Sequence, residues 1–216
     1  MKTLLLVSAT QMEIAPLLAQ LAVFQKEETV YQLSPTHQLA VVITGVGMTA
    51  TALALGTHYK QAVDVAINAG VAGSFVNHEP GTLVNVLNDL FSELGAEDND
   101  AFLSIDALGL GSASAKANRP YRSPLIQSLP SVKGITVNTV HGHAQSIEKI
   151  KARYQPDVES MEGAAFLFVC EQEHVPCLQL RAVSNFVERR NKETWNIPLA
   201  IENLNKQLIA ILNDLN

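Results

Sequence analysis

Cysteine is scarce in this chain, which has two copies among 216 residues. Secreted proteins that depend on disulfides carry denser sets of cysteines. Cys170 and Cys177 lie on either side of the helix-breaking pair Val175-Pro176, so the sequence places one in a helix and the other in a strand. Each is best interpreted as a small core residue rather than as half of a disulfide. We therefore expect a reduced, cytoplasmic protein.

Long apolar runs and an excess of positive charge are also missing. No segment approaches the roughly 20 consecutive apolar residues that a membrane-spanning helix requires. The apolar run that follows Lys2 is short and soon meets Glu13, which favours a first buried strand over a signal peptide. The net charge of −6 disfavours nucleic acids and anionic membranes as partners. Small molecules are the better candidates.

Neither a metal nor a dinucleotide cofactor is predicted. His141 and His143 are spaced awkwardly for one ion, and no cysteine or cluster of carboxylates accompanies them. Gly45 and Gly47 form a turn between a strand and a helix, but the third glycine position of a dinucleotide fingerprint holds Ala50, a soft exclusion because alanine is tolerated there. The turn remains a natural cradle for an anion or a hydroxyl, because free backbone N–H groups point into it.

The chain is rich in hydrophobic residues, at 47%, which suits a well-buried globular protein. Its length fits one domain over residues 1–216. Strands are predicted at 3–7, 29–33, 39–44, 63–68, 82–90, 133–140 and 177–183. Helices are predicted at 13–21, 48–61, 146–154, 161–174 and 197–216. This alternation predicts an α/β fold, a three-layer α/β/α sandwich with a mixed, mostly parallel central sheet.

The periodicity fades between residues 91 and 133. The segment is first acidic and then rich in small and turn-forming residues. Long irregular stretches in compact domains tend to be lids or binding loops, so we interpret this one as a loop region over a pocket. A surface excursion without a role explains the composition nearly as well.

The stretch 157–185 joins a helix start to a strand end. Ser160 is a plausible N-cap, Glu162 follows in the first turn, and the apolar strand CLQLRAV leads to Asn185. Folds of this class place ligands at the carboxyl ends of strands and the amino ends of helices, so Glu162 and Asn185 belong to the predicted site. In AGVAG, Gly70 and Gly73 either let a ligand approach the backbone closely or simply form a turn.

The segments VESMEGAA, RAVSN, ITGVGMTA and INAGVAG, with the amino-terminal strand that leads to Glu13, resemble the purine nucleoside phosphorylase and nucleosidase superfamily. The resemblance runs from Met1 to Asn203 and is closest to the nucleosidase branch typified by methylthioadenosine/S-adenosylhomocysteine nucleosidase. Within that branch the details resemble the futalosine hydrolases. The resemblance implies a nucleoside phosphorylase-like fold, hydrolysis of an N-glycosidic bond without metal or cofactor, and a homodimer.

The resemblance also implies roles for two carboxylates. Glu13 matches the residue that positions or deprotonates the attacking water, although a cap or salt bridge on its own helix would also account for it. Glu162 matches the glutamate that accepts hydrogen bonds from the ribose 2′ and 3′ hydroxyls, and Met161 would pack against the ribose. A helix amino terminus also stabilises a carboxylate without a ligand, so a structural role for Glu162 stays open.

Asn185 is a departure from the adenine-cleaving nucleosidases, which have an aspartate at this position. An amide can accept a hydrogen bond from a protonated N7 and donate one to a 6-oxo group, which matches hypoxanthine rather than adenine. It gives up proton donation, so another group or water must protonate N7; a structural asparagine at a strand end is the alternative. The matched segments add four expected substrate-binding residues, namely Gly47, Val71, Gly73 and Phe186.

The segment after Asn185 resembles the futalosine hydrolases more than the adenine-specific enzymes. Arg189 and Arg190 could meet a benzoate carboxylate at the 5′ end of the nucleoside, but a basic, solvated loop explains them better from sequence alone. Four aromatic residues are candidates either for the walls of a 5′ pocket or for the core, namely Phe91, Phe102, Phe186 and Trp195.

Two rival functions are weighed against hydrolysis. A phosphorylase needs an arginine-bearing phosphate site near the first glycine loop, and residues 1–54 contain no arginine, although the hydroxyls and N–H groups of 44–49 could still hold phosphate. A catalytically silent nucleoside-binding module would not require the water-side carboxylate of Glu13. Hydrolysis is therefore favoured.

Overall fold

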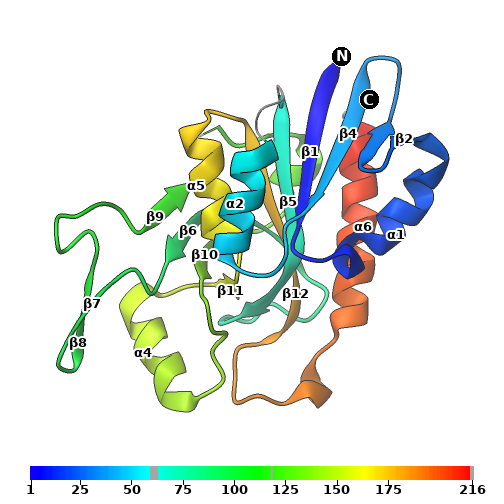
Figure 1. Cartoon of the computed structure of the whole chain (residues 1–216). Coiled ribbons are helices and arrows are strands. Elements are labelled where there is room, and N and C mark those ends of the chain that lie inside the picture. Colours follow the sequence, from blue (N-terminus) through cyan, green and yellow to red (C-terminus); the bar gives the residue numbers. More distant parts are fainter. Residues whose placement is uncertain (59–62, 118, 215–216) are drawn as a thin grey trace.

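A mixed β-sheet forms the centre of the computed structural model, which describes residues 1–58, 63–117 and 119–214 (Figure 1). Its strands are Lys2–Ser8 (β1), Gln25–Glu27 (β2), Val30–Gln32 (β3), His37–Ile43 (β4), Val65–Ser74 (β5), Leu83–Phe91 (β6), Ser114–Lys116 (β9), Ser131–Thr136 (β10), Val158–Ser160 (β11) and Cys177–Phe186 (β12). They lie in the order β11-β10-β6-β12-β5-β1-β4-β3-β2, with β9 beside β6. The long pairings, such as β1–β4 and β12–β5, are parallel, and shorter ones such as β12–β6 are antiparallel.

Helices cover both faces of this sheet. They span Gln11–Leu21 (α1), Met48–His58 (α2), Pro124–Gln127 (α3), Ala144–Tyr154 (α4), Gly163–Gln172 (α5) and Ile197–Asp214 (α6). Figure 1 shows α1 and α6 on one face and α2 and α5 on the other, and each pair belongs to a separate hydrophobic cluster. The predicted three-layer α/β/α class with a mixed central sheet is therefore confirmed.

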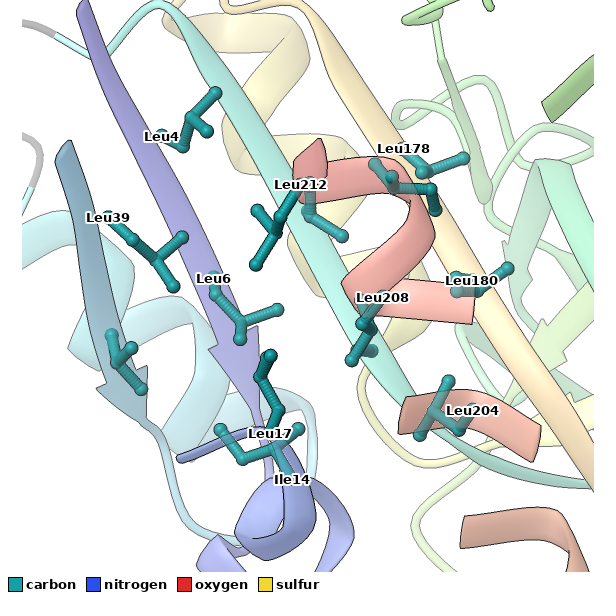
Figure 2. Packing of buried hydrophobic residues seen from close by; sticks show 14 of the residues in the cluster. Leu4, Leu6, Ile14, Leu17, Leu39, Leu178, Leu180, Leu204, Leu208 and Leu212 are labelled. Carbon is teal, nitrogen blue, oxygen red and sulfur yellow. The ribbon is translucent and has the colours of Figure 1, made fainter. Parts of the chain in front are cut away.

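The larger cluster explains why β1, β12 and α6 form where they do (Figure 2). Alternate residues of the two strands point to one face, and residues four apart on α6 meet them, as the periods of strand and helix require. Each fully buried leucine contributes about 2 kcal/mol of hydrophobic stabilisation. The leucines of this contact are Leu4, Leu6, Leu178, Leu180, Leu204, Leu208 and Leu212.

The short strand β11 closes part of the sheet on itself. It pairs with β10 in parallel and with β5 in antiparallel orientation, so β5, β12, β6, β10 and β11 form a ring. Gly73 of β5 pairs with Glu159 of β11 on one side and with Asn185 of β12 on the other. Closure therefore brings two distant parts of the sequence to neighbouring positions.

The interpretation of Gly70 and Gly73 as a turn is wrong, because β5 runs through both residues to Ser74. Glycine in a strand often marks a close approach of another group to the backbone, and this holds at both positions. A Cβ atom on Gly70 would lie 2.9 Å from Oε1 of Glu13, and one on Gly73 would lie 2.9 Å from Val187. The predicted strand 63–68 therefore ends too early, because β5 continues through both glycines to Ser74.

Other predicted boundaries also shift. Ser160 ends β11, and Glu162 occupies the N-cap position of α5, but the Ser160 hydroxyl still accepts a hydrogen bond from the N–H group of Gly163 (3.3 Å), the first residue of the helix. The predicted strand 133–140 stops at Thr136, which leaves 137–143 as a loop. Helix α2 is described as far as His58, and the predicted positions 59–61 lie outside the described residues, as do 215 and 216.

The region 91–133 contains more regular structure than predicted. Gly95–Asp98 (β7) and Ala101–Ser104 (β8) form a hairpin that projects from the body of the molecule in Figure 1. Beyond the hairpin, β9 joins the central sheet and α3 follows. The prediction of an irregular loop is therefore wrong for these segments, whose strands are too short to give a clear periodicity.

The burial of the two cysteines and the character of the helices match what the composition predicts. Cys170 and Cys177 are both buried thiols, as predicted for core residues. Among the described helices, none combines the length and the apolar character needed to cross a membrane.

Candidate functional site

A cavity of about 370 Å³ lies at the carboxyl ends of β1, β5 and β12 and the amino end of α5. Its position is the one expected for a ligand site in an α/β fold. The predicted site residues that line it are Glu13, Val71, Gly73, Met161, Glu162, Asn185 and Phe186. Gly47 is not part of the lining, but its N–H group donates a hydrogen bond to Glu162 Oε1 (3.0 Å). The structure thus brings together residues from five separate segments.

Glu13 lies at the third position of α1 and is buried, with 8% of its surface exposed. Its Oε2 atom accepts hydrogen bonds from the N–H group of Thr10 (2.9 Å) and the hydroxyl of Ser8 (3.2 Å), so the carboxylate caps its own helix. Its Oε1 atom accepts from the N–H group of Val71 (3.1 Å) at the cavity wall. The structural role weighed for Glu13 is present, and it fixes the carboxylate beside the cavity.

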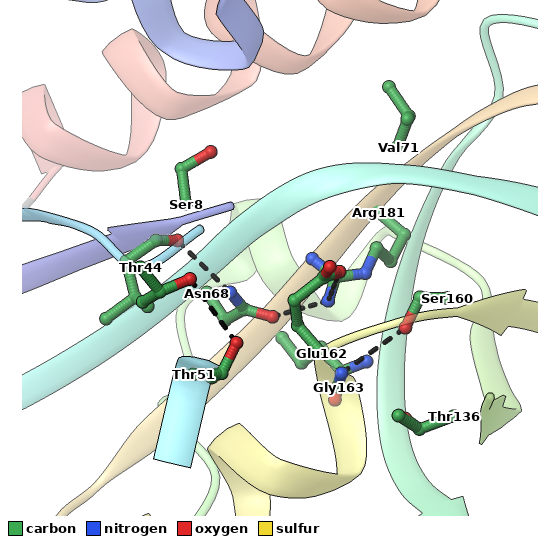
Figure 3. Close-up of polar contacts among 12 residues, drawn as sticks. Ser8, Thr44, Thr51, Asn68, Val71, Thr136, Ser160, Glu162, Gly163 and Arg181 are labelled. Atoms are coloured by element: carbon green, nitrogen blue, oxygen red, sulfur yellow. Dashed lines mark hydrogen bonds and ion pairs between the residues drawn. The ribbon is translucent and has the colours of Figure 1, made fainter. Parts of the chain in front are cut away.

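Glu162, at the N-cap position of α5, is also held by contacts with the protein and lies beside Arg181 (Figure 3). The N–H group of Gly47 donates to Oε1, so the turn predicted to hold an anion binds a carboxylate of the protein itself. Oε2 lies 4.0 Å from Nη2 of Arg181. Both contacts hold the carboxylate in place, and it retains lone pairs that can accept hydrogen bonds at the cavity.

Arg181 of β12 is the residue that sequence reasoning missed. Its side chain is 1% exposed, and Nη2 donates to Asn68 Oδ1 (2.5 Å). A Cβ atom on Gly70 would lie 2.9 Å from both Arg181 Nη1 and Glu13 Oε1, so the guanidinium approaches Glu13 as well as Glu162. The available signal was a single arginine in an apolar strand, since a fully buried charge requires partners.

Asn185 has its amide oriented by its neighbours in β12. The hydroxyl of Ser184 donates to Oδ1 (2.8 Å), and Nδ2 donates to the carbonyl oxygen of Phe186 (2.8 Å). These two bonds determine which end of the amide is oxygen. One N–H hydrogen and one lone pair remain for a ligand at the cavity wall.

His141 and Glu159 form a pair that the sequence did not suggest. The N–H group and the Nδ1 atom of His141 bond the two oxygens of Glu159, at 3.0 and 2.7 Å. Both residues line the cavity, on the loop after β10 and on β11. Sequence reasoning considered His141 only as a metal ligand and did not anticipate this carboxylate partner 18 residues along the chain.

A buried network holds the start of α5 in place. Asp89 accepts hydrogen bonds from the hydroxyl of Thr136 (2.9 Å) and from Nε2 of Gln179 (2.8 Å), and the hydroxyl oxygen of Thr136 accepts from the N–H group of Ala164 (2.7 Å). Burial away from water raises the pKa of the Asp89 carboxyl above its usual 3.8, and the bonds from Gln179 and Thr136 oppose this shift. The network therefore positions the helix that carries Glu162.

The candidates for a 5′ pocket divide into two groups. Arg190 and Trp195 line the cavity, and the guanidinium of Arg190 lies 4.8 Å from the centre of the Trp195 ring. Among the described residues, Arg189, Phe91 and Phe102 are not in the lining. No described residue of 91–133 contributes to it either, so this segment does not cover the cavity of its own chain.

Comparison with known proteins identifies the family of the chain. A family model described as the phosphorylase superfamily matches residues 3–214. The chain belongs to the phosphorylase superfamily. One curated relative is the futalosine hydrolase of Streptomyces coelicolor. It is 32% identical to this chain over 142 residues, which cover 64% of this chain and 60% of the relative. The futalosine hydrolase of Thermus thermophilus is 28% identical over 177 residues, which cover 78% and 79%. The chain thus spans less than two thirds of the Streptomyces relative.

Solved structures share the fold over 99% of this chain. The futalosine hydrolase of Helicobacter pylori superposes with a TM-score of 0.81 at 16% identity, covering 99% of this chain and 98% of that one. The 5′-methylthioadenosine/S-adenosylhomocysteine nucleosidase of the same organism gives 0.81 at 17% identity, covering 99% of both chains. The two likenesses are equal in score, so the fold alone does not select a substrate.

Proposed function

We propose that the protein hydrolyses the N-glycosidic bond of futalosine, releasing hypoxanthine and dehypoxanthine futalosine in menaquinone biosynthesis. The observation that carries the proposal is the oriented amide of Asn185 at the wall of a cavity that also holds Glu13 and Glu162. Curated relatives with the name futalosine hydrolase support it. We further propose a homodimer that works in the cytoplasm.

In the proposed reaction, water replaces the purine at C1′ of the ribose. The C1′–N9 bond breaks and its electrons leave with the base, while the water oxygen bonds to C1′. Glu13 accepts a proton from this water and later returns it to solvent, while the departing base takes up a proton from solvent. Glu162 accepts hydrogen bonds from the ribose hydroxyls and favours positive charge on the sugar. Arg181, whose Nη2 atom lies 4.0 Å from Oε2 of Glu162, places a positive charge beside this carboxylate and helps to hold it in position.

Asn185 would select the base. Its remaining N–H hydrogen suits the O6 atom of hypoxanthine, and its Oδ1 atom suits a protonated N7. The 6-amino group of adenine would instead present a donor to this donor. Because the carbonyl oxygen of Phe186 only accepts hydrogen bonds, rotation of the amide would replace this bond with two facing oxygens. The arrangement therefore favours a 6-oxopurine.

The 5′ substituent would extend toward Arg190 and Trp195. Arginine binds carboxylates through paired N–H groups, and a flat guanidinium over an indole ring is held ready for such a contact. The benzoate of futalosine supplies both a carboxylate and an aromatic ring. This pairing is the reason for preferring futalosine over a simpler 6-oxopurine nucleoside.

Hydrolysis is favoured over phosphorolysis by the glycine turn. The N–H group of Gly47, which would otherwise be open to phosphate, is bonded to Glu162. No arginine occurs in residues 1–54 to complete a phosphate site. The runner-up functions are a methylthioadenosine/S-adenosylhomocysteine-type nucleosidase and another 6-oxopurine nucleosidase or phosphorylase, which would use the same two carboxylates.

The test is a substrate panel. The protein is incubated with futalosine, inosine, methylthioadenosine and methylthioinosine, each with and without phosphate, and the released base is followed by chromatography. We expect hypoxanthine from futalosine at a rate independent of phosphate. Release of adenine but not hypoxanthine would contradict the base assignment, and a requirement for phosphate would identify a phosphorylase.

A further inference from the structure

The pair formed by His141 and Glu159 has no part in the reaction described above, yet it faces the same cavity. Glu159 is almost fully buried, at 4% exposed, and both of its oxygens are occupied by one residue, since the N–H group and the Nδ1 atom of His141 bond them at 3.0 and 2.7 Å. A two-point contact of this kind fixes the imidazole ring in position and in rotation. Phe75 packs edge-on against the ring, with 6.1 Å between ring centres.

The same contact determines which ring nitrogen carries hydrogen. A carboxylate only accepts hydrogen bonds, so Nδ1 of His141 must be the donor in the 2.7 Å contact with Glu159. In the ring with a single proton, Nε2 is then a lone-pair acceptor. No described residue bonds to Nε2, and the side chain, 13% exposed, lines the cavity. The protein thus holds an oriented acceptor without a partner at a ligand site.

The position of this acceptor relative to Asn185 follows from Gly73. Gly73 pairs with Glu159 on one neighbouring strand and with Asn185 on the other. A Cβ atom on Gly73 would lie 3.4 Å from Nδ2 of Asn185 and 3.6 Å from Cγ of Glu159. Both side chains therefore lie on the same face of the sheet, beside Gly73, where Val187 also packs. A flat ring that contacts the Asn185 amide can therefore also contact His141, which Glu159 holds in place.

We propose that His141 reads the purine base, with Nε2 accepting a hydrogen bond from N1–H of a 6-oxopurine. The inference deepens the proposed function and rests on it. In hypoxanthine, N1–H is the ring atom next to the C6 carbonyl whose oxygen Asn185 would bind. In adenine, N1 carries a lone pair, which would meet the lone pair of Nε2. Glu159 acts through His141 as a positioning residue.

Binding of free bases tests this directly, because it needs no turnover. Dissociation constants are measured by calorimetry for hypoxanthine, 1-methylhypoxanthine and adenine with the wild-type protein, with His141→Phe, and with His143→Phe as the control. His143 is exposed and lies two residues away, outside the cavity lining. Wild type and control should bind hypoxanthine about 10-fold more tightly than 1-methylhypoxanthine, as one hydrogen bond allows. His141→Phe should reduce this ratio to about 2-fold or less.

Phenylalanine keeps the bulk of the ring, which separates hydrogen bonding from shape. If His141→Phe still rejects 1-methylhypoxanthine, then steric exclusion explains the preference and the inference is overturned. A large loss of kcat on a hypoxanthine nucleoside with unchanged hypoxanthine binding would also overturn it, in favour of proton donation to the leaving base. Preference of the wild-type protein for adenine would instead contradict the proposed function itself.

Discussion

The cavity has two ends that are built differently. At the carboxylate end, Glu13 and Glu162 both accept hydrogen bonds from backbone N–H groups, and Glu162 also lies 4.0 Å from the buried guanidinium of Arg181. At the amide end, Asn185 and His141 are held by their immediate neighbours and each retains unused hydrogen-bonding capacity toward the cavity. The first end is part of the core of the fold, and the second is a set of side chains supported by it.

This difference separates the residues proposed to carry out the reaction from those proposed to recognise the base. Substitutions at the carboxylate end disturb buried charges and helix caps, so they should lower both the free energy of unfolding and the activity. Exchanges at the amide end should mainly change which base is accepted. The fold and the carboxylate end therefore argue for the class of chemistry, while the amide end argues for a 6-oxopurine.

The largest effect is expected for Glu13→Gln at the carboxylate end. The amide cannot accept a proton from water, so kcat should fall by about 10²- to 10⁴-fold with little change in KM. Glu148→Gln is the matched control, because the Glu148 side chain is 75% exposed on α4. Steady-state kinetics on futalosine measures the change, and a loss of less than about 10-fold would remove Glu13 from the proposed role.

Arg181→Met should produce the next largest effect, on stability. Removing the guanidinium takes the neighbouring cation from Glu162 and the donor from Asn68 Oδ1, which should lower the free energy of unfolding by about 3 kcal/mol. Urea unfolding measures it, with Arg189→Met, at an exposed position outside the cavity lining, as the control. Equal stability of the two variants would show that the carboxylate end is not held by this charge.

Asn185→Asp tests the amide end and should mainly alter specificity. A carboxylate accepts from the 6-amino group of adenine and repels the O6 atom of hypoxanthine. The ratio of kcat/KM for 6-oxopurine over 6-aminopurine nucleosides should fall by about 10-fold or more. Unchanged base preference would mean that another residue distinguishes the two bases.

The smallest effect is expected for Asp89→Asn, in the buried network that positions the start of α5. The pKa of Asp89 is raised by burial in the folded state, so its contribution to stability is fully present below its unfolded value near 3.8 and is lost as the pH rises through the raised folded value. The variant has no such titration, so its stability should rise relative to wild type across that pH range. Urea unfolding over a pH series measures it, and a constant difference between the two proteins would contradict the shift.

Much of the fold could be predicted from the sequence because its signals are local. Alternating apolar strands and helices with Pro and Gly breaks identify the layers, and β1 and α1 lie close to the predicted 3–7 and 13–21. The continuation of β5 through Gly70 and Gly73 could not be predicted, because it depends on partner strands and on close contacts that only tertiary structure supplies. The hairpin of β7 and β8 has strands too short for a periodicity.

The candidate site divides in the same way. Glu162 and Asn185 could be found from their places at a helix start and a strand end, and the motif resemblance added Glu13. The pairing of His141 with Glu159 depends on closure of the sheet by β11, which no local pattern indicates. The buried guanidinium of Arg181 likewise becomes meaningful only once its carboxylate partners are in place.

The central claim, that the amide end selects a 6-oxopurine, is tested most directly by one competition experiment. Futalosine and its 6-amino counterpart are supplied together at equal concentration to the wild-type protein, and the hypoxanthine and adenine released are quantified at early times. The ratio of products equals the ratio of the two kcat/KM values. We predict at least about 10 molecules of hypoxanthine for each adenine, and an excess of adenine would contradict the account.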